Sequence, residues 1–214
     1  YDWEMAQIQL NILDEHRQAG LAGIRHAAAK GMATVVMEPL RGGSLVSNVP
    51  PEVQALVDQY PEKRPLVEWC FRWLYNLPEV TLILSGTSSM AQLQENLRIF
   101  ENAQPGVMSK NDLALIAEIA DRFEARRTVG CTGCRYCMPC PSGVSIPEVF
   151  STFNRYLLTA RTPADREAYR QNLLERGMGG DRCVACGACA KHCPQSLDIP
   201  KLLKDVHQEM IGET

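Results

Sequence analysis

The chain has 214 residues, 45% hydrophobic and 22% charged, a composition typical of globular proteins with one large or two modest domains. A net charge of −3, with no stripe of basic residues, argues against nucleic acid or an anionic membrane surface as a partner. No apolar run approaches the roughly 20 residues of a transmembrane helix, so we expect no membrane partner.

The first 104 residues alternate short apolar strands with helices. Strands are expected at 5–10, 31–37 and 81–86, and helices at 21–30, 51–58, 63–76 and 90–100, with Pro65 in a first turn and Ser88 or Ser89 as a cap. The helix at 63–76 is expected to bury one apolar face, namely Leu66, Trp69, Cys70, Trp73 and Leu74. Strand–helix–strand units at this spacing predict parallel pairing, in an open α/β sheet or part of a (β/α) barrel. Three strands cannot cover themselves, and Tyr1 directly precedes a strand, so we expect the chain to continue a larger protein.

A linker at 105–112 and an amphipathic helix lead into a cysteine-rich region that contains an internal repeat. The apolar face of that helix is expected to consist of Leu113, Ile116, Ile119, Ala120 and Phe123. The segments CPSGVSIPEVF (140–150) and CPQSLDIPKLL (193–203) lie 53 positions apart, and each places a proline in the first turn of a predicted helix. The repeat predicts a mostly helical, pseudo-twofold domain at 128–214 after a first domain at 1–127.

Eight of the nine cysteines fall into two runs. They are Cys131, Cys134, Cys137 and Cys140, then Cys183, Cys186, Cys189 and Cys193. The second run is C-x2-C-x2-C-x3-C-P, the bacterial ferredoxin pattern for a [4Fe–4S] cluster, and the first is one residue shorter before its last cysteine. Zinc, which usually takes separated C-x2-C pairs, and disulfides are the weaker alternatives. The pattern predicts a ferredoxin domain with two [4Fe–4S] clusters in a reducing compartment, the cytoplasm.

Each run ends in Cys-Pro, at Cys140 and at Cys193. In two-cluster ferredoxins the fourth cysteine of each run binds the other cluster, so we expect the two ligand sets to cross. The alternative is local binding, in which residues 131–140 close one cluster alone.

The ninth cysteine and the histidines carry weaker signals. Cys70 lies between Trp69 and Trp73 at core spacing, which predicts a buried, inert thiol. His16, His26 and His207 are expected at the surface, and His192 is expected either to tune a cluster or to be exposed.

Three segments of the first half resemble the C-terminal part of the aldo/keto reductase barrel: QIQLNILD (7–14), VVMEPLRGG (35–43) and LSGTSSMAQLQENL (84–97). In that family they are strands 6–8 of a (β/α)8 TIM barrel, whose strands hold NAD(P)H at their C-terminal ends. With cysteine runs appended, the chain resembles the iron–sulfur branch of the family over essentially its whole length.

The resemblance implies a set of cofactor-binding residues. Gln7 would contact the nicotinamide, Pro39 and Leu40 the pyrophosphate, Gly86, Thr87 and Ser88 the adenosine phosphates, and Glu95 and Asn96 the adenine. Three positions depart from the family pattern: Met37 replaces the usual stacking aromatic, Glu38 replaces the common serine, and Gln92 replaces a basic residue that often meets the 2′-phosphate. The alternative is that EPLRGG and SGTSS are ordinary strand-to-helix turns.

The implied function of the parent protein is that of an oxidoreductase. It would pass hydride between NAD(P)H and a small-molecule carbonyl, and the clusters would exchange single electrons with a redox partner. The catalytic Asp, Tyr, Lys and His of the family lie on strands before the sixth, so this fragment alone is expected to be inactive. The alternatives are a non-catalytic electron-transfer module and a structural iron–sulfur domain on a degenerate barrel.

Overall fold

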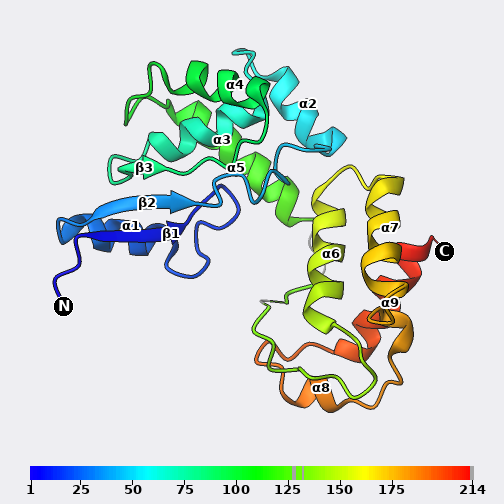
Figure 1. Cartoon of the computed structure of the whole chain (residues 1–214). Coiled ribbons are helices and arrows are strands. Elements are labelled where there is room, and N and C mark those ends of the chain that lie inside the picture. The colour runs from blue at the N-terminus through cyan, green and yellow to red at the C-terminus, as the bar shows by residue number, and fades with distance from the viewer. Residues whose placement is uncertain (127–128, 132, 213–214) are drawn as a thin grey trace. The chain divides into compact units, whose positions relative to one another are not determined.

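The computed structural model describes residues 1–126, 129–131 and 133–212, and the chain divides into two compact units, Tyr1–Glu124 and Ala125–Thr214 (Figure 1). The domain boundary predicted at 127/128 lies outside the described residues. Within the described ranges, no helix is both long and apolar enough to cross a bilayer.

The first unit contains a three-stranded parallel sheet in the order β1 (Met5–Gln9), β2 (Ala33–Met37), β3 (Leu82–Ile83) (Figure 1). In the chain, α1 (Gly20–Ala29) connects β1 to β2. The register aligns Gln7 with Val35 and Val35 with Leu82. The predicted parallel pairing is therefore confirmed. The third strand is two residues long, shorter than the predicted 81–86, and pairs with Val35 and Val36 of β2.

Four helices complete this unit: α2 (Pro51–Gln59), α3 (Leu66–Tyr75), α4 (Met90–Phe100) and α5 (Lys110–Glu124). The predicted apolar face of α3 is buried throughout, namely Leu66, Trp69, Cys70, Trp73 and Leu74. Pro65 precedes α3 as its N-cap instead of lying in its first turn. On α5 the expected core residue Leu113 is 39% exposed, and Leu115 is buried instead.

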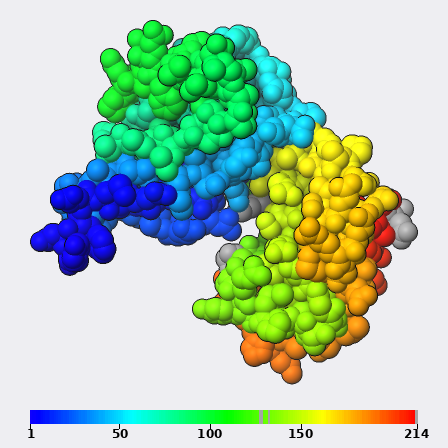
Figure 2. All heavy atoms as spheres, in the orientation of Figure 1, coloured from blue at the N-terminus to red at the C-terminus, as the bar shows by residue number. Residues whose placement is uncertain are grey.

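Apolar side chains also remain uncovered along β3 and α4. Leu82 is 48% exposed, Leu93 42% and Leu97 64%, so the apolar side of α4 is only partly packed. The N-terminal end of the chain, dark blue in Figure 2, projects from this unit with Tyr1 and Trp3 exposed. Exposed apolar area of this kind is usual where another segment or partner packs.

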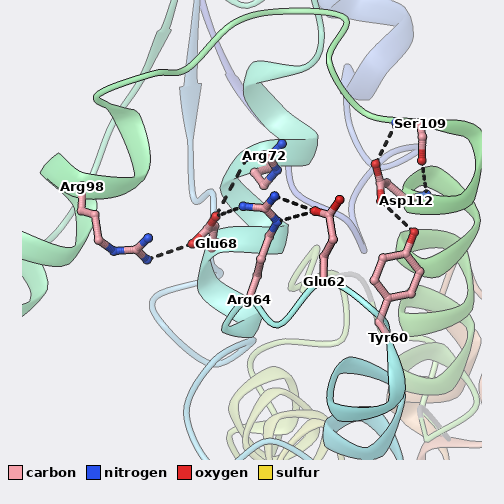
Figure 3. A network of polar contacts seen from close by, with 8 residues as sticks. All are labelled: Tyr60, Glu62, Arg64, Glu68, Arg72, Arg98, Ser109 and Asp112. Carbon is pink, nitrogen blue, oxygen red and sulfur yellow. Dashed lines mark hydrogen bonds and ion pairs between the residues drawn. The ribbon is translucent and has the colours of Figure 1, made fainter.

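A buried carboxylate ties α3 to α4 (Figure 3). Glu68 is 5% exposed and accepts hydrogen bonds from Arg64 Nη1 at 2.7 Å and from Arg98 Nη2 at 2.8 Å. Arg72 lies at 4.0 Å from the same carboxylate. Burial by itself opposes ionisation, but the hydrogen bonds from Arg98 and Arg64 outweigh it and lower the pKa of Glu68.

The second unit is helical. Its helices α6 (Ile146–Leu158) and α9 (Ile199–Ile211) have 13 residues each and a proline in the first turn, as the 53-residue repeat predicts. Between them lie α7 (Pro163–Tyr169), the π-helical segment η1 (Arg170–Leu174), the 3-10 turn η2 (Gly180–Arg182) and α8 (Ala188–Lys191). Buried side chains of α6, α7 and α9 form its core, and six of the eight clustered cysteines pack against that core.

Candidate metal centre and nucleotide site

Two hollows in the second unit are lined by the clustered cysteines. The first hollow has a volume of about 380 Å³. Its cysteines are Cys137, Cys140, Cys183, Cys186 and Cys189, with His192, Tyr136 and Val184 among its other lining residues. The second hollow is tighter, about 20 Å³, and its cysteines are Cys131, Cys134, Cys137 and Cys193, against Phe150 and Ile199.

The distribution of cysteines between the hollows crosses the two runs. Cys140, the last of the first run, lines the hollow of the second run, and Cys193 lines the hollow of the first. Cys137 lines both hollows. Since the first hollow already has four other cysteines, Cys137 completes a set of four in the second.

The cysteines that shift the pKa of Cys189 and of Cys137 are mostly those that line the same hollow. Burial raises the pKa of the Cys189 thiol, and the nearby Cys183 and Cys140 raise it further. Burial likewise raises the pKa of the Cys137 thiol, with additional contributions from Cys131, Cys189 and Cys134. Without a cation these thiols stay protonated near neutral pH, so metal binding there has to displace protons.

Local backbone geometry curls both loops around their hollows. Arg135, directly after the second cysteine of the first run, has φ of 65°, and Ala185 and Gly187, on either side of the second cysteine of the second run, have φ of 53° and 74°. Turn hydrogen bonds follow, from Met138 N–H to Arg135 O at 2.9 Å and from His192 N–H to Cys189 O at 3.2 Å. Gly133 N–H points at Cys131 Sγ at 3.4 Å, the kind of amide–sulfur contact that tunes iron–sulfur clusters.

The donor set fits an iron–sulfur cluster. All eight clustered cysteines are free thiols, and each hollow offers four of them. Among the described residues, no three His, Cys, Asp or Glu side chains converge closely enough for a single metal ion. The first hollow has ample volume for a multinuclear cluster, whereas in the second the donor set rather than the volume supports the fit.

The isolated cysteine and the histidines lie as follows. Cys70 is fully buried, as predicted, and burial raises the pKa of its thiol to about 12, which disfavours the reactive thiolate. His16, His26 and His192 are exposed, and His192 also lines the first hollow. The prediction for His207 is wrong: it is half-buried, because its Nδ1 lies 3.4 Å from the hydroxyl of buried Tyr169.

The residues that the barrel resemblance assigns to the nicotinamide cofactor are only partly brought together. Thr87 and Asn96 line a hollow of about 450 Å³ beside β3, which Pro39 and Leu40 do not line. Gln7 is exposed on β1, and its Nε2 donates to Met37 Sδ at 3.3 Å.

At the start of α4 the backbone amides are partly engaged. Ser88 N–H donates to Gln92 Oε1 at 3.0 Å, and Gln92 N–H donates to Ser89 Oγ at 3.2 Å, which makes Ser89 the cap. Asn96 Nδ2 donates to Ser85 Oγ at 2.8 Å. Gly86 is exposed, and Glu95 is half-buried. The Gln92 side chain therefore accepts from the Ser88 amide, which the resemblance assigns to phosphate binding.

A polar cluster that the sequence reasoning missed follows β1. Asp14 is fully buried and accepts hydrogen bonds from Gln9 Nε2 at 2.7 Å and Asn11 Nδ2 at 2.9 Å. Arg41 Nε lies 3.5 Å from the same carboxylate, and Asn11 Nδ2 also donates to Glu38 O at 3.0 Å. The cluster ties the loop after β1 to the loop after β2, and the one signal for it was the NILDE segment directly after a strand.

Comparison with known proteins gives two family matches. Residues 130–197 match the 4Fe-4S dicluster domain, and residues 1–121 match the aldo/keto reductase family. No curated protein matches the chain. A similar solved structure is the holo form of the aldo-keto reductase AKR11C1 from Bacillus halodurans, at 23% identity and a TM-score of 0.42 over 54% of this chain. The match spans 42% of that protein. Because the reductase family match includes more than half of its 214 residues, the chain belongs to the aldo/keto reductase family.

Proposed function

We propose that this chain is part of an oxidoreductase in which the C-terminal part of an aldo/keto reductase barrel carries a domain with two [4Fe–4S] clusters. The observation that carries the proposal is the pair of hollows: three cysteines of one run and the last cysteine of the other line each hollow, and Cys137 lines both. Mononuclear zinc or disulfides do not require this exchange, whereas two-cluster ferredoxins use it.

The protein residues have defined tasks in this proposal. Cys140, Cys183, Cys186 and Cys189 would hold one cluster, and Cys131, Cys134, Cys137 and Cys193 the other. Bound clusters supply one-electron transfer. The apolar residues that line the hollows, such as Ile146, Phe150 and Leu203, would limit the access of water. The exposed Cys134 and Cys186 leave one side of each site near the surface, where a redox partner can approach.

In the first unit, we assign β1, β2 and β3 to strands 6–8 of the barrel. The parallel order and the uncovered apolar residues of β3 and α4 support this assignment, because a closed barrel needs further strands there. Thr87 and Asn96 would contribute to the adenosine end of an NAD(P)H site, once Gln92 releases the Ser88 amide.

The parent protein would then move hydride between NAD(P)H and a small-molecule carbonyl, with the clusters serving a one-electron partner in the cytoplasm. A second candidate is a cluster domain whose role is structural. Its support is that six of the eight clustered cysteines pack against the core of the second unit, so that metal binding would also stabilise the fold.

The crossing can be tested with pairs of cysteine variants, by counting iron after anaerobic reconstitution. In Cys140→Ala/Cys186→Ala both changes fall in one proposed set, so the chain should keep about four irons. In Cys140→Ala/Cys134→Ala both sets are damaged, and little iron should remain. The reverse result, with about four irons in the second pair only, would establish local binding.

A further inference from the structure

The segment between the two cysteine runs is hydrogen-bonded to both of the loops that supply cysteines to the first hollow. Met178 O accepts a hydrogen bond from Ser145 N–H at 3.0 Å, five residues after Cys140. Gly180 O accepts a hydrogen bond from Cys183 N–H at 3.1 Å. Residues 178–180 therefore connect the loop that carries Cys140 with the start of the loop that carries Cys183.

Tyr169 holds this segment from within the core. Its side chain is fully buried at the end of α7, and its hydroxyl oxygen accepts a hydrogen bond from Gly180 N–H at 3.2 Å. The same oxygen lies 3.4 Å from His207 Nδ1 on α9. Burial raises the pKa of the Tyr169 phenol, so the hydroxyl stays protonated near neutral pH.

The backbone of Gly180 has no free space around it. A Cβ atom there would lie 2.9 Å from Leu203 O, 3.2 Å from His207 Cβ and 3.3 Å from the Tyr169 hydroxyl. The peptide of Gly180 is thus packed between α7 and α9. The N–H of Gly180 donates to the Tyr169 hydroxyl, and its carbonyl oxygen accepts from Cys183 N–H.

The π-helical segment η1 follows Tyr169 directly. Glu175 N–H donates to Arg170 O at 3.0 Å, and Met178 N–H donates to Leu173 O at 2.8 Å, so the chain reverses immediately after a wide turn. Leu173 is buried in the same core as Tyr169. Segments of this kind are often found at functional sites, and here the wide turn leads into the strap of residues 178–180.

We infer that Tyr169 is a positioning residue for the cluster of the first hollow. Its hydroxyl fixes the Gly180 peptide and thereby the distance between Cys183 and Cys140. The inference rests on the proposed function. None of the cysteines of the second hollow takes part in this series of hydrogen bonds, so the effect is specific to one cluster.

The test is the rate at which a chelator removes iron from reconstituted Tyr169→Phe, followed by visible absorption. Phe keeps the ring but removes the acceptor of the buried Gly180 amide. The loss of a hydrogen bond of this kind predicts about tenfold faster release of half of the iron. Tyr156→Phe is the matched control: it removes the hydroxyl of another buried tyrosine, which accepts from Arg166 Nη2 at 3.1 Å and donates to Glu209 Oε1 at 3.3 Å, and neither partner belongs to a cysteine loop. It should leave both rates unchanged.

Two cysteine backgrounds identify the affected cluster. In Cys134→Ala the remaining intact site is the first hollow, and Tyr169→Phe should accelerate its iron release. In Cys186→Ala the second hollow remains, and the rate should not change. Equal acceleration in both backgrounds, or none in either, would overturn the inference.

The outcome separates this inference from the proposed function. A wild-type chain that binds no iron would refute the proposed function, whereas a loaded wild type with an unselective Tyr169→Phe refutes the positioning role alone. If Tyr169→Phe does not fold, judged by circular dichroism, Gly180→Ala displaces the same peptide from the side of Leu203. It should show the same selectivity, and equal release rates for both clusters would again overturn the inference.

Discussion

Replacing Glu68 by Gln is expected to destabilise the first unit clearly more than the same change at Glu62. Both carboxylates bind Arg64, Glu62 at 2.6 Å and Glu68 at 2.7 Å (Figure 3). They differ in environment, since the side chain of Glu62 is 58% exposed and that of Glu68 7%. The two variants therefore compare an exposed ion pair with a buried ion pair, both made by Arg64.

The magnitude follows from the contacts. Glu68 accepts two charge-assisted hydrogen bonds, each worth about 1.5–3 kcal/mol when buried. Gln keeps one acceptor oxygen and loses the other. The side chain of Arg98 is 57% exposed and can be hydrated once released, so the cost stays below that of an uncompensated buried charge. We expect about 2 kcal/mol for Glu68→Gln, or about 8 °C in Tm for a unit of this size. For Glu62→Gln we expect at most about 0.5 kcal/mol.

Denaturant unfolding followed by tryptophan fluorescence is the assay, because Trp3, Trp69 and Trp73 all lie in the first unit. The pKa of Glu68 is lowered in the folded state, so its stabilisation is present above the usual carboxyl pKa and is lost as the pH falls through the folded value. The difference between wild type and Glu68→Gln should shrink between about pH 5 and pH 3. Equal costs for the two variants at pH 7 would refute the reasoning.

Two further predictions use the same fluorescence assay. Because burial raises the pKa of Cys70 to about 12, the stability of wild type relative to Cys70→Ala should fall by about 1.4 kcal/mol per pH unit above about pH 9; parallel pH profiles would contradict this. Ser89→Ala removes the cap of α4 and should cost about 1 kcal/mol, whereas exposed Ser88→Ala should cost little; equal costs would argue against the cap.

Hydrophobic periodicity and motif spacing predicted the elements that are specified by local sequence signals. The face of α3 from Leu66 to Leu74 is buried as expected, because apolar residues at helical spacing must face the core. Ser89 caps α4, and the two Ile-Pro segments begin helices of equal length, since both signals are local. Parallel pairing of the strands also followed from their spacing.

Features that depend on tertiary contact were not predictable in the same way. The strand predicted at 81–86 is reduced to β3, since it pairs only with Val35 and Val36 of β2, and the segment's own residues do not encode the extent of that pairing. His207 looked like a surface residue, and its approach to Tyr169 depends on how α7 and α9 pack. Asp14 gave no periodic signal, because its partners Gln9, Asn11 and Arg41 come from separate loops and a strand end. The residues assigned to the nicotinamide cofactor follow only from the family resemblance, and the other residues of that family's site lie on strands that precede these three.

The most direct test of the account is the iron and acid-labile sulfide content of the anaerobically purified wild-type chain. Two clusters on eight cysteines predict about eight irons and about eight sulfides per chain, with brown absorption that bleaches on reduction. Stoichiometric zinc without visible absorption would contradict the central claim that the crossed cysteine sets hold iron–sulfur clusters.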